Sequence, residues 1–72
     1  MNQRMKLLDV VALTEDLPNR KLRRGQVGTV VELLGPDVFE VEFTDNDGRA
    51  FASLALKAVQ LMVLYYQPLE AA

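Results

Sequence analysis

Within the segment 38–43, apolar and acidic side chains alternate from Phe39 onward. The apolar members of this alternation are Phe39, Val41 and Phe43, and its acidic members are Glu40 and Glu42. Successive side chains of a β-strand point to opposite faces, so this period of two predicts a strand. We expect the apolar face to lie in a core and the acidic face to be solvated. A strand of this kind needs partners, and the chain is therefore constrained to a fold built from paired strands.

The chain contains four other short apolar runs, and three of the four segments between the runs contain glycine, proline, asparagine or aspartate. The runs cover 7–13, 27–33, 49–56 and 61–65; the separators are a long loop (14–26), a turn (35–37), a hairpin loop (45–48) and a single turn (57–60). This order predicts an all-β chain, an SH3-like small barrel of about five strands with one 3-10 or short helical turn before the last strand. The alternative is a helix over 54–64, which is rich in good helix formers.

A chain of 72 residues has room for one domain, 1–72. We expect an ordered core over about 6–66 and frayed termini. The chain contains no cysteine and no histidine. It therefore lacks the side chains that form disulfides, thiolate or imidazole metal sites and histidine-based catalytic triads. We expect no enzyme activity, no catalytic residue, no metal and no cofactor.

The net charge of −2, with 25% charged residues, is typical of a soluble globular domain. The longest wholly apolar run, 61–66, is far shorter than the about 20 residues of a membrane-spanning helix. No signal-peptide pattern opens the chain. We therefore expect a cytoplasmic protein with no membrane partner and no small-molecule substrate.

The first and last apolar runs carry apolar side chains on both faces, which is more than one barrel interior can bury. In the first run, one face is formed by Leu8, Val10 and Ala12, and on the other Leu7, Val11 and Leu13 lie with Asp9. In the last run, one face is formed by Val59, Leu61, Val63 and Tyr65, and the other by Met62, Leu64 and Tyr66. The first and last strands are neighbours in an SH3-like barrel, so their second faces should join.

An exposed apolar patch of this kind usually marks a binding site for another protein. We predict that the partner-binding residues are Leu7, Val11, Leu13, Met62, Leu64 and Tyr66. The expected partner is a second copy, which would give a homo-oligomer, or a companion protein. The alternative is that an end of the chain folds over the patch.

Four cations gather within five positions of the long loop, namely Arg20, Lys21, Arg23 and Arg24. Such a cluster is a candidate anion-binding site for RNA phosphates or for an acidic partner. The loop contains no aromatic side chain on which a base could stack, and this disfavours RNA. A solvated loop without a ligand is the alternative.

The acidic loop 45–48 resembles a calcium loop only superficially. Alignment of Gly48 with the glycine of an EF-hand places Phe43 and Leu54 where the first and last carboxylates belong. We therefore interpret this segment as a hairpin loop.

Four segments together resemble a known family: 8–13, 22–32, 39–43 and 47–49. The chain is similar, from about Lys6 to about Pro68, to short bacterial proteins, frequent in cyanobacteria, that are catalogued as a domain of unknown function. The resemblance implies a small β-barrel without an established activity, and genes that often lie beside other short genes. The spacing of Gly25, Gly28 and Val30 also resembles KOW-type segments and the barrel of the nitrile hydratase β subunit.

These observations favour a non-catalytic module for protein–protein interaction, with an antitoxin-like or immunity-like role as its most concrete form. The alternatives are KOW-like binding of RNA or ribonucleoprotein through the loop at 20–24, and a small accessory subunit of a larger enzyme.

Overall fold

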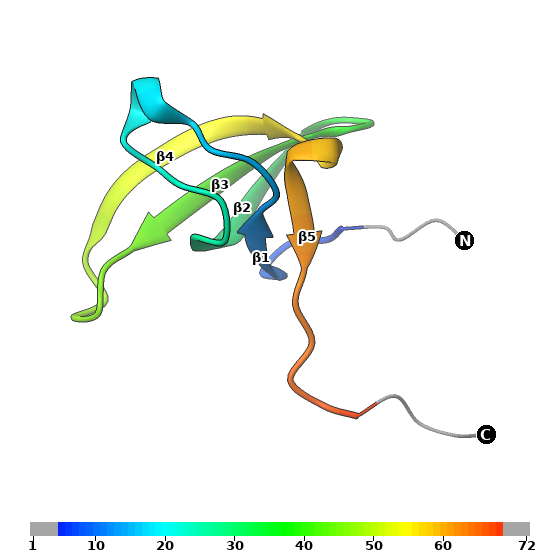
Figure 1. Cartoon of the computed structure of the whole chain (residues 1–72). Coiled ribbons are helices and arrows are strands. Elements are labelled where there is room, and N and C mark those ends of the chain that lie inside the picture. The colour runs from blue at the N-terminus through cyan, green and yellow to red at the C-terminus, as the bar shows by residue number, and fades with distance from the viewer. Residues whose placement is uncertain (1–4, 69–72) are drawn as a thin grey trace.

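The computed structural model describes residues 5–68 and contains one sheet of five antiparallel strands. The strands are β1 (Val10–Leu13), β2 (Val27–Gly35), β3 (Val38–Thr44), β4 (Ala50–Lys57) and β5 (Leu61–Val63), and the 3-10 turns are η1 (Pro18–Arg20) and η2 (Ala58–Gln60). The order across the sheet is β4-β3-β2-β1-β5 (Figure 1). The predicted all-β class and the turn before the last strand are confirmed, and the alternative helix over 54–64 is wrong. The predicted fraying concerns 1–4 and 67–72, of which 1–4 and 69–72 lie outside the described residues.

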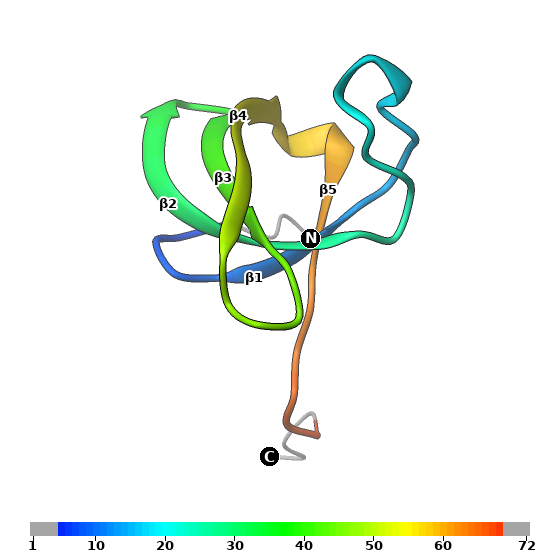
Figure 2. The ribbon, with the colours of Figure 1, turned by 90° about the vertical axis from the view of Figure 1, so that its left-hand side faces the viewer.

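The sheet curls along β2, the strand that joins the β1–β5 side of the sheet to the β3–β4 side. The first part of β2 pairs with β1, whereas β3 follows β2 along nearly its whole length. Two register shifts interrupt the β2–β3 ladder, between Val30 and Glu32 and between Leu33 and Gly35. Extra residues at such positions bend a strand and increase its twist. Figure 2 shows the result, with β2 and β3 on one side of the curl and β5 on the other.

Gly28 lies where β2 passes between β1 and β3, opposite Val11 on one side and Phe43 on the other. A Cβ atom at this position would lie 2.7 Å from Val41 Cγ1 and 2.9 Å from the Glu42 carbonyl oxygen. Both distances are shorter than real Cβ contacts allow, and the second atom belongs to the backbone. The close approach of β2 and β3 therefore requires glycine here.

The inner side of the curl holds the core. Its most completely buried side chains are Val11, Leu13, Val30, Val41 and Phe43, each at most 1% exposed. The cluster also contains Leu22, Phe39, Leu56 and Leu61. The predicted core face of β3 is thus confirmed. Of the described residues, no polar or charged one is buried.

The first strand is shorter than predicted, because a turn occupies its first three expected positions. Asp9 accepts the Lys6 backbone N–H on Oδ2 at 3.0 Å, and its own N–H donates to the Lys6 carbonyl at 3.0 Å. Leu8 adopts a left-handed conformation with φ of 72°. The strand predicted from Leu7 therefore begins at Val10.

The hairpin loop predicted at 45–48 is confirmed. One carboxylate oxygen of Asp45 accepts the N–H groups of Asp47 (2.9 Å) and Arg49 (3.0 Å). Gly48 completes the turn with φ of 81°, which a side chain would disfavour. The Asp45 side chain thus closes the turn.

Candidate protein-binding face

The outer side of the sheet is apolar where β5, β1 and β2 meet. Ala12 lies directly opposite Val27 on β2 and Met62 on β5. Residues directly opposite each other share a face, so these three form one cross-strand row. Val10 and Leu64 lie on the same side, two residues from Ala12 and Met62 respectively, and the Leu64 N–H donates to the Val10 carbonyl at 2.9 Å. We call these five residues the outer apolar face.

The larger side chains of this face remain in contact with solvent. Met62 is 54% exposed and Val27 is 47% exposed, whereas Ala12 between them is only 5% exposed. Ala12 is absent from the core cluster, so its burial comes from neighbours on the outer side. The two larger side chains beside Ala12 therefore remain available for contact with another protein.

The predicted faces of the first strand are wrong. Val11 and Leu13 were expected on the exposed patch, but they are 0% and 1% exposed and pack in the core. Their register explains this, because they lie opposite Val63 and Leu61 on the inner side. The outer face of β1 is the alternate set, Val10 and Ala12.

The other predicted patch residues fall in three places. Met62 and Leu64 lie on the outer apolar face, as predicted, with Leu64 half-buried. Leu7 is 53% exposed but precedes β1 in the turn. Tyr66 is 82% exposed and follows the end of β5.

Sequence reasoning missed Val10, Ala12 and Val27. The available signal was size, since Val11 and Leu13 on either side of Ala12 fill a core better than alanine does. Val27 was placed on a strand, but its position beside Ala12 depends on the β1–β2 register, which has no local signature.

An acidic band continues the outer side of the sheet onto β2 and β3. Glu32 lies directly opposite Glu40, and Glu42 follows two residues later on β3. The Ser53 hydroxyl donates to Glu40 Oε2 at 2.6 Å. Over residues 5–68, the single ion pair joins Lys6 to Asp9, at 3.6 Å, so no cation neutralises Glu32, Glu40 or Glu42. This acidic band borders the outer apolar face through Thr29, which pairs with both Val10 and Glu42.

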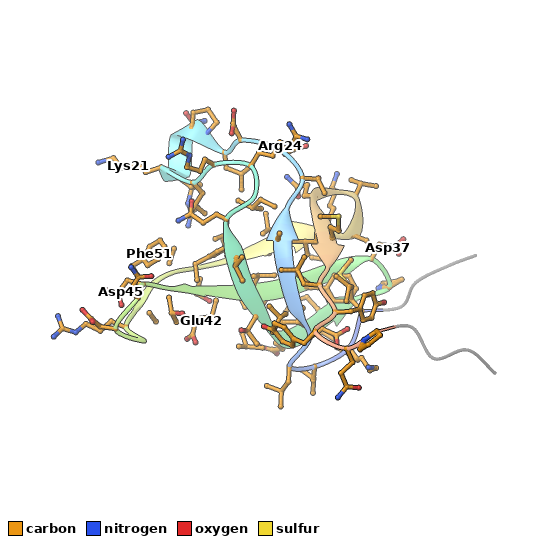
Figure 3. The ribbon with its side chains drawn as sticks, turned by 60° about the horizontal axis from the view of Figure 1, so that its bottom comes forward. Lys21, Arg24, Asp37, Glu42, Asp45 and Phe51 are labelled. Carbon is orange, nitrogen blue, oxygen red and sulfur yellow. The ribbon has the colours of Figure 1, made fainter. Side chains whose placement is uncertain are left out.

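The four cations of the long loop, the basic loop (Arg20, Lys21, Arg23 and Arg24), are all exposed. None of them forms an ion pair with a carboxylate in the described part of the chain. Figure 3 shows Lys21 and Arg24 at one end of the molecule and Glu42 on the side of β3 that faces away from them. The basic loop and the acidic band therefore present opposite charges in different directions.

The basic loop is held in one conformation by its own residues. Leu22 is 3% exposed and anchors the loop in the core. Leu17 and Leu22 exchange two backbone hydrogen bonds of 2.9 and 3.2 Å. The Arg24 N–H donates to Asp16 Oδ1 at 2.8 Å, and the Arg23 N–H donates to the Gln26 side chain at 3.1 Å. The cations are thus displayed on a braced loop.

No group of three or more histidine, cysteine, aspartate or glutamate residues within 5–68 could hold a metal ion. Ser53 and Lys57 both lie in β4, four residues and therefore about 13 Å apart along the strand. A hollow of about 460 Å³ lies beside η2 and is lined by Asp37, Val38, Lys57, Ala58 and Val59. It contains no nucleophile paired with a base.

The helical turns of the described residues are too short to cross a membrane. A family model described as a domain of unknown function (DUF4926) matches residues 7–63. No curated protein and no solved structure matches the chain. The predicted resemblance to a family of unknown function, from about Lys6 to about Pro68, is confirmed over the matched range.

Proposed function

Because the chain belongs to the family described as a domain of unknown function (DUF4926), we propose its function from its own geometry. The protein is a non-catalytic module for protein–protein interaction. It binds a companion protein or a second copy through the outer apolar face. The observation that carries this proposal is the cross-strand row of Val27, Ala12 and Met62, whose two large members are about half exposed.

The surroundings of the outer apolar face support a protein partner rather than a nucleic acid. The face itself carries no charge, and the neighbouring acidic band would repel phosphates. An apolar centre with a polar border is the usual anatomy of a protein interface. Antitoxin-like or immunity-like binding and service as a small accessory subunit of an enzyme are two forms of this function. We place both in the bacterial cytoplasm.

The test compares two substitutions that add the same charge at different places. Met62→Glu puts a carboxylate on the outer apolar face, whereas Val59→Glu puts one on η2, at a residue that is 80% exposed. We expect Met62→Glu to lose association with the companion, measured by copurification from the source cell, or with itself, measured by sedimentation. Val59→Glu should behave as the wild type. Equal association by all three proteins would overturn the proposal.

A second function, KOW-like binding of RNA or ribonucleoprotein, is favoured by the braced display of unpaired cations on the basic loop. Phosphate contacts require affinity to fall steeply with salt. Wild-type protein should then bind single-stranded RNA at low salt, and the Arg23→Glu/Arg24→Glu variant should not. Absence of RNA binding at low salt would exclude this second function. It would not affect the proposal that the outer apolar face binds a protein.

A further inference from the structure

The two edges of the sheet differ in how they are protected. The β5 edge is only three residues long, and short edge strands resist unwanted pairing. The β4 edge is eight residues long, contains no proline, and carries no charge before Lys57. Its register irregularity lies near its start, where Phe51 is an extra residue between Ala50, opposite Thr44, and Ala52, opposite Phe43. Natural proteins rarely leave so long and apolar an edge unpaired.

The backbone groups that β4 presents can be identified from its ladder. Lys57 lies opposite Val38. One residue further along, Ala58 lies opposite Asp37, and this pair is hydrogen-bonded, because the Ala58 N–H donates to the Asp37 carbonyl at 2.9 Å. In an antiparallel ladder, bonded and non-bonded pairs alternate. Ala52, Leu54 and Leu56 therefore bond to β3, whereas the N–H and C=O groups of Ser53, Ala55 and Lys57 point away from it.

The Lys57 N–H donates to Gln60 Oε1 at 2.9 Å, so within 5–68 the outward groups without a partner are those of Ser53 and Ala55. Apart from the β3 ladder, no residue of 50–56 takes part in a backbone–backbone hydrogen bond within 5–68. Phe51, Ser53, Ala55 and Lys57 are all exposed. Figure 2 shows β4 as the strand nearest the viewer, with no ribbon drawn in front of it. The edge is free to accept another strand.

We propose that β4 pairs with β4 of a second copy, antiparallel and about a two-fold axis, so that two five-stranded sheets become one continuous sheet. Under two-fold symmetry, each β4 edge supplies hydrogen-bond partners to the same backbone N–H and C=O groups of the other copy. Residues directly opposite each other must share a face, so the axis passes through a residue that lies opposite itself.

Charge and length select that residue. An axis at Ser53 would place Lys57 opposite Arg49 of the second copy, and like charges directly opposite each other are unfavourable. An axis at Ala55 would leave only the segment 53–57 paired. An axis at Leu54 pairs 51–57 and places Lys57 opposite the half-exposed Phe51 ring, over which an ammonium group is stabilised. We therefore assign the axis to Leu54.

The first test is the oligomeric state of the full chain by sedimentation equilibrium. Wild-type protein should be dimeric. Ala55→Pro removes an outward N–H and no bond to β3, so it should keep the native circular dichroism spectrum. Because two donors are lost per dimer, it should weaken dimerisation by about ten-fold or more. The Ser53→Lys/Ala55→Lys variant, which keeps every backbone group, should dissociate through charge repulsion.

The second test reads the register by disulfide formation, since the chain contains no cysteine of its own. With the axis at Leu54, the two Cα atoms of Leu54→Cys lie about 4.5 Å apart, within disulfide range. Those of Ser53→Cys and of Ala55→Cys lie about 8 Å apart, beyond it. Only Leu54→Cys should form a covalent dimer under mild oxidation.

Three results would overturn the proposal: a monomeric wild type, a folded Ala55→Pro variant that dimerises normally, or a covalent dimer from Ser53→Cys or Ala55→Cys but not from Leu54→Cys. Met62→Glu separates this pairing from the proposed function. If Met62→Glu abolishes the dimer, the outer apolar face holds it and the edge pairing is wrong. If the dimer persists, the edge pairing stands whatever the outer apolar face binds.

Discussion

β1 and β3 have the same kind of inner face and opposite kinds of outer face. Inside, Val11 and Leu13 pack in the same core as Val41 and Phe43. Outside, β3 carries Glu40 and Glu42, whereas β1 carries Val10 and Ala12. Burial in the core explains the inner faces of both strands. It does not explain the apolar outer side of β1. An outer side that lacks the polar residues of β3 therefore indicates a binding surface for a partner.

The largest expected effect tests whether the inner side of β1 is buried as deeply as the inner side of β3. We expect Leu13→Ala to lower the free energy of unfolding by about 2–5 kcal/mol, close to the about 3–5 kcal/mol expected for Phe43→Ala. The reason in both cases is a cavity in a closely packed core. Urea unfolding measures the loss, with Met62→Ala as an exposed control of smaller effect. A cost below about 1 kcal/mol for Leu13→Ala would mean that β1 faces the other way.

A charge placed on the outer side of β1 tests how well water reaches that side. Ala12→Asp should lower the free energy of unfolding by about 1–3 kcal/mol, because Val27 and Met62 cover this position and leave the carboxylate poorly solvated. Ala55→Asp makes the same change at an exposed outer position of β4, opposite Glu40, and should cost only the about 0.2–1 kcal/mol of a like-charged cross-strand pair. Equal costs at the two sites would show that β1 is as open to water as β4.

On the acidic band, a change of charge should raise the stability of the fold. Glu32→Lys converts a like-charged pair with Glu40 into an oppositely charged one, so it should stabilise the fold by about 0.2–1 kcal/mol. Thermal unfolding at low and high salt measures the gain, which salt should reduce. Asp47→Lys changes the net charge equally on the hairpin loop and should give no comparable gain.

The smallest effect on stability belongs to the outer apolar face. Met62→Thr should change the free energy of unfolding by less than about 0.5 kcal/mol, because the side chain is half exposed and the β-branched replacement suits a strand. Partner binding should nevertheless weaken. Loss of stability without loss of binding would assign Met62 to the fold rather than to recognition.

The sequence was sufficient to predict β3, because the acidic residues of one face identify the other as the core. It was insufficient for β1, where both faces are apolar and only the register with β5 decides between them. The predicted hairpin at Asp45 rests on local chemistry and is confirmed. The pair of Glu32 and Glu40 depends on the register shift after Val30, for which the chain has no local signal.

The basic loop illustrates the same limit. Its cations could be read from the sequence, and so could its length. The braces could not, because Leu22 returns to the core and Asp16 reaches Arg24 only once the two arms of the loop lie side by side. Their contacts are tertiary, although the residues are close in the chain.

The mutual backbone bonds of Leu17 and Leu22 close the neck of the loop and leave Pro18–Lys21 outside it. Changes beyond a closed neck do not reach the strands, and exposed polar loop tips tolerate insertions well. The tip is therefore a permissive site at which a peptide, a tag or a fluorophore could be grafted. In a chain without cysteine, a thiol introduced there would be unique, so this small sheet could serve as a display scaffold.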